Sequence, residues 1–93
     1  MKIIQSRLFE QRVKRFSKAQ KLALDEQVLR IARKPGVGIE KRGDLRGVFV
    51  HKFKIRDVQY LLAYRVKEQR LELIMIGPHQ NYYRDLKRYL GKK

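Results

Sequence analysis

Two lysines and a histidine have types and spacing that suit chemistry on a phosphate group. Lys52 and Lys54 lie in a stretch that alternates apolar and polar residues, so on a β-strand both side chains would share one face. Their Cβ atoms would be about 7 Å apart, which suits a phosphate-carrying backbone. His79 follows a Gly-Pro pair in a polar segment, where an imidazole group could transfer protons near neutral pH. The alternative for the lysines is a solvated strand face that discourages edge pairing.

Four further residues bear on this group. Tyr82 and Tyr83 start a C-terminal segment with helical spacing, so one ring is expected in the core and the other could stack on a base. Arg65 would lie beside the lysines in one strand register, which the sequence leaves open. His51 alternates in step with apolar residues, and we expect it to be a half-buried packing residue.

The charge of the chain predicts a polyanionic partner. Its 93 residues include 24 Lys and Arg against 9 Asp and Glu, a formal charge of +15. The halves before and after the Leu45–Arg46 bond carry +7 and +8, so the charge belongs to a folded surface. A nucleic acid or an acidic protein fits this charge better than an anionic membrane. Apolar residues make up 43% of the chain, which is enough for one modest core in a single domain over residues 1–93.

Composition also excludes several classes of site. The absence of cysteine removes disulfide frameworks, thiol chemistry and zinc ribbons, and suits a reducing compartment. Two histidines among scattered acids do not predict a metal cage, and nothing predicts a cofactor. We find neither a signal peptide nor an apolar stretch long enough to cross a bilayer, so we expect a cytoplasmic protein.

Hydrophobic periodicity predicts an α+β fold. Ser6 and Ser17 are N-cap candidates for two helices, the second ending at Pro35-Gly36. A loop is expected over residues 37–47, after which the apolar period changes from 3.6 to 2. The order is β-α-α-β-β-β-α, an antiparallel β-sheet meander packed against an N-terminal helical hairpin. The strands are expected at residues 2–5, 48–55, 58–66 and 71–76, and the last helix at 81–90.

These features indicate a basic nucleic-acid-binding domain, and a resemblance adds to them. Nearly the whole chain resembles toxins of the RelE/ParE superfamily from bacterial type II toxin–antitoxin systems. The order and spacing of its motifs carry the resemblance: Leu45-Arg46-Gly47, His51-Lys52-Phe53-Lys54-Ile55, Tyr60-Leu61-Leu62-Ala63-Tyr64-Arg65-Val66, and Ile76-Gly77-Pro78-His79 with a tyrosine after it.

The resemblance implies one of two toxic activities. RelE-like members cut mRNA in the ribosomal A site without a metal, and ParE-like members poison DNA gyrase. Lys52 and Lys54 match the paired strand lysines of the former, and His79 with Tyr83 resembles the histidine and aromatic of the YafQ-type branch. The favoured function is therefore a ribosome-dependent mRNA endonuclease that inhibits translation.

For such an enzyme, the RNA 2′-hydroxyl attacks the neighbouring phosphate. Lys52 and Lys54 would stabilise the developing charge, one of them acting as base if its pKa is depressed, His79 would be general acid or base, and Tyr83 would stack on the substrate. The candidates for RNA binding are Arg46, Arg65 and Tyr82.

The chain also departs from the RelE pattern. Leu61 stands where such toxins usually carry an arginine, which leaves a gyrase inhibitor or a non-catalytic nucleic-acid-binding module as alternatives. The resemblance implies a cognate antitoxin that docks in an apolar groove between the helical hairpin and the sheet. It also implies that the protein contacts the ribosome and mRNA, and that operator DNA is bound only by the toxin–antitoxin complex. We expect no contact with a membrane.

Overall fold

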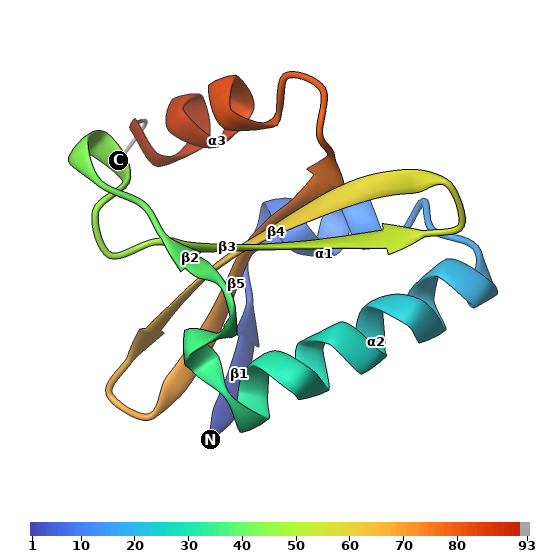
Figure 1. Ribbon diagram of the computed structural model, residues 1–93, viewed down its shortest axis with the longest axis horizontal. Coiled ribbons are helices and arrows are strands. Elements are labelled where there is room, and N and C mark those ends of the chain that lie inside the picture. Colours follow the sequence, from blue (N-terminus) through green and yellow to red (C-terminus); the bar gives the residue numbers. More distant parts are fainter. Residues whose placement is uncertain (92–93) are drawn as a thin grey trace.

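The computed structural model describes residues 1–91 as a five-stranded sheet with helices on both faces (Figure 1). Lys92 and Lys93, which end the predicted domain, lie outside the described residues. The α+β class and the predicted order of helices and long strands are confirmed. The elements are β1 (Lys2–Gln5), α1 (Arg7–Val13), α2 (Lys18–Arg33), the 3-10 turn η1 (Pro35–Val37), β2 (Ile39–Glu40), the 3-10 turn η2 (Gly43–Leu45), β3 (Phe49–Ile55), β4 (Val58–Lys67), β5 (Arg70–Pro78) and α3 (Tyr82–Gly91).

The sheet has the strand order β1-β5-β4-β3-β2. β3, β4 and β5 form the expected antiparallel meander, whereas β1 joins the free side of β5 in a parallel pairing. The segment expected to be a loop contains the short β2, where Ile39 lies opposite Val50 and Glu40 opposite Phe49. β5 also runs to Pro78, two residues further than predicted.

Both predicted serine caps are present at the helices that follow β1. The Ser6 hydroxyl accepts a hydrogen bond from the Phe9 amide at 3.0 Å and starts α1. Ser17 and Gln20 form a reciprocal capping box that starts α2. None of the helices within residues 1–91 is long and apolar enough to span a lipid bilayer.

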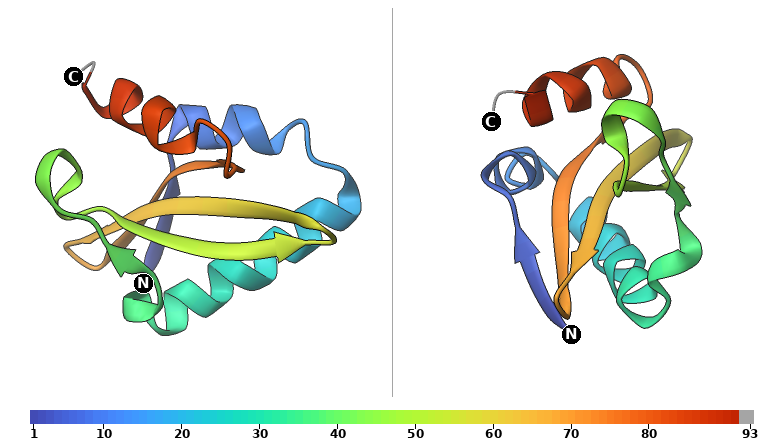
Figure 2. Two further views of the ribbon diagram at one scale, coloured as in Figure 1. Left: turned by 45° about the horizontal axis from the view of Figure 1, so that its top comes forward. Right: turned by 90° about the vertical axis from the view of Figure 1, so that its left-hand side faces the viewer.

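The sheet separates two apolar clusters, with α2 and α3 on opposite faces (Figure 2). Leu24 and Ile31 of α2 are buried against one face, and Tyr82 and Leu86 of α3 against the other. Because residues alternate along β4, Leu62 belongs to the first cluster and its neighbours to the second. We call the second side the α3 face.

His51 is a packing residue, as the sequence predicts. It is 8% exposed on the α2 side of β3, its ring stacks on Phe53, and its Nε2 atom lies 2.7 Å from the Oε1 atom of Gln27. Burial, assisted by the charge of Arg30, lowers the pKa of His51 below its ordinary value of 6.5.

This lowered pKa predicts a loss of stability in mild acid. Below pH 6.5 the unfolded chain binds a proton at His51 more readily than the folded chain does, so the free energy of unfolding falls as the pH falls from that value toward the folded pKa. Thermal melts of wild type and His51→Gln between pH 8 and pH 5 measure this effect. The variant should have a smaller loss of melting temperature over that range, and parallel curves would contradict the assignment.

Candidate nucleic-acid interface

The two strand lysines share the α3 face, as the alternation predicts. Lys52 and Lys54 are exposed while the intervening Phe53 is buried on the other side. Lys52 lies opposite Leu61 of β4, and Lys54 lies opposite Gln59. Paired residues on adjacent antiparallel strands point to the same side of the sheet. Lys52 therefore shares a side with Leu61, and Lys54 shares it with Gln59.

The structure places His79 at the same end of the sheet as the lysines. It follows the last residue of β5 and is exposed, and its amide donates to the Gln59 carbonyl at 3.2 Å. This hydrogen bond extends the β4–β5 ladder by one step, so Lys54, Gln59 and His79 follow one another across three strands. Two strand spacings give about 10 Å between the main chains of Lys54 and His79.

The two tyrosines that start α3 have different environments. Tyr82 is 1% exposed, its hydroxyl donates to the Met75 carbonyl at 2.6 Å, and burial raises its pKa. The prediction that Tyr82 binds RNA is wrong, because neither face of its ring is available to a base. Tyr83 remains partly exposed and packs edge-on against Tyr82.

Lys41 joins Tyr83 to the segment around β2, and sequence reasoning missed it. Its ammonium group lies 5.0 Å from the centroid of the Tyr83 ring, within cation–π range. The Lys41 amide donates to the Val48 carbonyl at 2.8 Å, which continues the β2–β3 pairing by one residue. Lys41 directly follows the short β2, and the sequence predicted a loop for this stretch. The sequence therefore did not indicate the contact with Tyr83.

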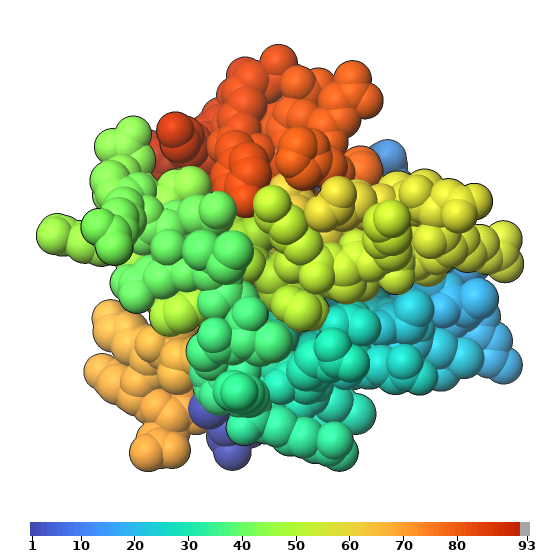
Figure 3. Space-filling model, viewed as in Figure 1, coloured from blue at the N-terminus to red at the C-terminus, as the bar shows by residue number. Residues whose placement is uncertain are grey.

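Arg46 lies near this lysine in an open depression of about 420 Å³. Figure 3 shows the segment around β2 and η2 (green) beside the start of α3 (red-orange), with β3 between this segment and the β3–β4 turn. The predicted phosphate-binding residue Arg46 is exposed after η2 and adds charge on the Tyr83 side of the interface. The depression is lined by Glu40, Lys41, Arg42 and Arg46.

Arg65 does not lie beside the strand lysines. It pairs with Glu72 of β5, and its Nε atom is 3.4 Å from a carboxylate oxygen of that residue, without the geometry of a hydrogen bond. Arg65 is four residues beyond Leu61, which places it about 13 Å along β4 from the row of Lys52. The pairing of β4 with β3 and β5 therefore settles the register that the sequence left open and places Arg65 away from the lysines.

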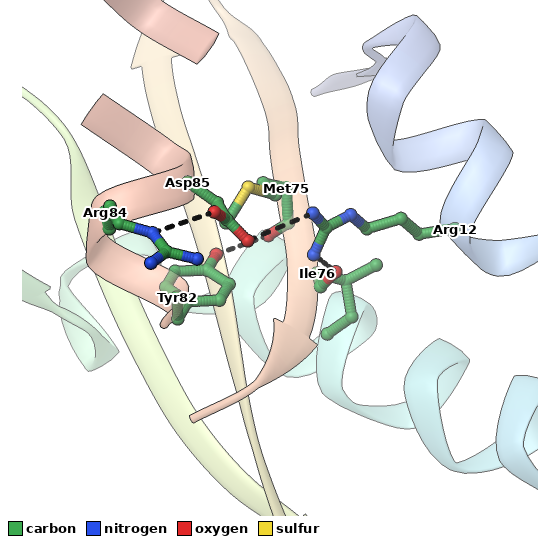
Figure 4. Close-up of polar contacts among 6 residues, drawn as sticks. All are labelled: Arg12, Met75, Ile76, Tyr82, Arg84 and Asp85. Atoms are coloured by element: carbon green, nitrogen blue, oxygen red, sulfur yellow. Dashed lines mark hydrogen bonds and ion pairs between the residues drawn. The ribbon is translucent and has the colours of Figure 1, made fainter. Parts of the chain in front are cut away.

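A small polar network anchors the start of α3 (Figure 4). Asp85 lies between two guanidinium groups, 3.7 Å from Arg12 of α1 and 3.6 Å from Arg84. Arg12 also donates from Nη1 to the Ile76 carbonyl at 3.3 Å. The network connects α1, β5 and α3 on the α3 face, and no sequence motif marked Arg12.

The interface offers ammonium, guanidinium, imidazole and phenol groups. Such groups can stabilise negative charge on a phosphate and transfer protons to or from its ester oxygens. Within residues 1–91, no three His, Asp or Glu side chains form a group that could hold a metal ion.

The chain matches a known protein family over most of its length. The family described as "ParE-like toxin of type II bacterial toxin-antitoxin system" matches residues 3–87. A search of curated proteins gives no significant match.

Solved structures of toxins have the same fold. The isolated E. coli RelE toxin is 16% identical, covering 95% of this chain and 97% of that one with a TM-score of 0.66. A chain of the intact E. coli RelBE toxin–antitoxin complex is 15% identical, covering 82% and 93% with a TM-score of 0.66. The YoeB/ParE toxin from Agrobacterium tumefaciens is 22% identical, covering 85% and 99% with a TM-score of 0.66. At these identities the likeness establishes the fold.

Proposed function

We propose that this chain, which belongs to the ParE-like toxins of type II bacterial toxin–antitoxin systems, arrests growth as a ribosome-dependent endoribonuclease that cleaves mRNA and inhibits translation. The observation that carries this proposal is the placement of Lys52, Lys54 and His79 at one end of the α3 face. The main chains of Lys54 and His79 are about 10 Å apart and Lys52 lies on the same strand face as Lys54, so two flexible cations and an imidazole can act on one phosphodiester. Cleavage on translating ribosomes would place the activity in the cytoplasm.

The proposed reaction uses the nucleophile that RNA itself carries. The 2′-hydroxyl loses its proton and attacks the adjacent phosphorus, and the bond to the 5′-oxygen breaks as that oxygen gains a proton. The products are a 2′,3′-cyclic phosphate and a 5′-hydroxyl. Lys52 and Lys54 stabilise the charge on the phosphorane, His79 exchanges a proton with one of the two reacting oxygens, and one of the lysines exchanges a proton with the other.

Tyr83 and the basic segment beside it would hold the neighbouring nucleotides. The ring of Tyr83 is partly exposed, and Lys41 covers it from one side. A flexible lysine can leave the ring for a phosphate while a base stacks in its place. Arg46 supplies a further cation for the RNA backbone at the same side of the interface.

Primer extension on abundant mRNAs after induced expression tests the proposal. We expect discrete cuts that appear only while the mRNA is being translated, and 5′-hydroxyl ends at those cuts. Inhibiting translation initiation before induction should remove the cuts, which is the control for ribosome dependence. Intact mRNA in growth-arrested cells would overturn the proposal.

A gyrase inhibitor is the second candidate. The family description names ParE-like toxins, and Leu61, which lies between Lys52 and Gly77 in the sheet, is buried and uncharged. In this alternative the basic surface binds gyrase and DNA. The same induction experiment separates the two candidates, because gyrase poisoning gives an SOS response with intact mRNA. A non-catalytic nucleic-acid-binding module would give neither result.

The family also supports a cognate antitoxin as partner. We propose that it docks in the apolar depression between β1, α1 and α2, which has a volume of about 410 Å³. Ile3 and Leu29 at this depression are 40% and 52% exposed, so a partner would remove apolar surface from water. An acidic antitoxin would also complement the charge of +15. Operator DNA would be bound by the complex of the two proteins.

A further inference from the structure

One row of residues crosses the α3 face from β3 to β5. Lys52 of β3 lies opposite Leu61 of β4, which in turn lies opposite Gly77 of β5. The row therefore begins with an exposed cation, continues with a buried apolar side chain and ends with a residue that has no side chain.

The guanidinium group of Arg12 occupies the place above Gly77. A Cβ atom built at position 77 would lie 2.6 Å from Arg12 Nη1 and 3.6 Å from the Tyr82 ring, so it would point to the α3 face. The absence of a side chain at Gly77 leaves room for a cation that comes from α1. The guanidinium group of Arg12 thus ends the row that Lys52 begins, and the main chains of Lys52 and Gly77 are two strand spacings, about 10 Å, apart.

The ion pairs around Arg12 leave it able to bind an anion. Asp85 is shared with Arg84, so one carboxylate faces two guanidinium groups and the cluster keeps a positive charge. The contact between Arg12 and Asp85 is 3.7 Å long, and about a third of each side chain is exposed. Such pairs are weak, whereas a guanidinium and a phosphate form short charge-assisted hydrogen bonds.

We infer that Arg12 is an RNA-binding residue that contacts a substrate phosphate at the β5 end of this row. The inference deepens the proposed function and rests on it. Lys52 and Lys54 approach the RNA from β3, and Arg12 approaches it from the side of α1, with His79 following β5 on the same face. Leu61, in the middle of the row, carries no charge, and Arg12 of α1 supplies a cation at the β5 end instead.

Two variants that break the same ion pair separate phosphate binding from a structural role. Arg12→Gln and Asp85→Asn both remove the Arg12–Asp85 ion pair, but only the first removes the cation. The probe for binding is a single-stranded 2′-O-methyl RNA, which lacks the nucleophile and cannot be cleaved. For each phosphate that the protein no longer neutralises, the slope of log affinity against log salt should become shallower by about 0.7. Cleavage is measured on translating ribosomes by primer extension, and folding by thermal melts.

We expect Arg12→Gln to lower cleavage by about 10²-fold and to reduce the salt slope, while Asp85→Asn keeps both within about threefold of wild type. Arg12→Lys, which keeps the charge, should keep the wild-type slope, and this variant decides the question if Arg12→Gln does not fold. Equal losses in Arg12→Gln and Asp85→Asn would show a purely structural role and overturn the inference. A reduced slope in Arg12→Lys would overturn it as well.

The failure of this inference can be told from the failure of the proposed function. If wild type cleaves mRNA and Arg12→Gln cleaves it equally well, only the role of Arg12 is wrong. If wild type produces no cuts, the ribonuclease proposal fails first and the role of Arg12 falls with it.

Discussion

Replacing Lys54 and His79 together by alanine is expected to abolish growth arrest and to lower the rate of mRNA cleavage by at least about 10³-fold. The double variant removes a charge-stabilising cation and the candidate proton-transfer group from one row of the sheet. Both side chains are exposed, so the thermal melt should stay close to that of wild type. Growth after induction and primer extension on mRNA are the two measurements.

A matched control removes charge from the other side of the molecule. Lys18 and Lys21 are exposed on α2, which packs against the opposite face of the sheet. Their double alanine variant loses two cations and should retain growth arrest and cleavage. Full growth arrest by the Lys54→Ala, His79→Ala variant would contradict the site assignment. Loss of toxicity in the control would show that the effect comes from total charge.

Tyr82→Ala is expected to lower the free energy of unfolding by about 3–5 kcal/mol. The substitution removes a ring that is 1% exposed in the core of the α3 face, and it leaves the Met75 carbonyl without its hydrogen bond. In a domain of this size such a loss lowers the melting temperature by more than about 10 °C. Urea denaturation followed by circular dichroism measures it.

The neighbouring tyrosine is the control for this prediction. Tyr83 is partly exposed, so Tyr83→Ala should cost much less stability but should weaken RNA binding and cleavage. The two variants thus separate a packing role from a binding role at adjacent positions. Equal destabilisation by both substitutions would contradict the different burial of the two rings.

Local patterns were sufficient for the main elements of the fold. The alternation around Phe53 places Lys52 and Lys54 on one face, because side-chain direction along a strand depends only on adjacent residues. Ser6 and Ser17 cap helices through contacts three residues away. The parallel pairing of β1 with β5 was not predicted, because it joins segments almost 70 residues apart and leaves no periodic signal in either.

The relative placement of the candidate residues was predictable where they lie on one element. Tyr82 and Tyr83 differ by one position, and the phase of α3 against the sheet decides which ring is buried. The position of Arg65 stayed open because its neighbours depend on strand register, and the β4–β5 pairing contains an irregularity next to Tyr64. Arg12 reaches the site only because Gly77, 65 residues later, leaves space for it.

The position of β5 between β1 and β4 makes the candidate interface assemble late during synthesis of the chain. β1 leaves the ribosome before the other strands, but its strand partner within residues 1–91 is β5, and the Ser6 hydroxyl donates to the Ile74 carbonyl at 2.6 Å. His79 and Tyr83 follow β5 directly. A nascent chain therefore has no assembled interface until β5, His79 and Tyr83 have left the ribosome and β5 has paired with both of its neighbours.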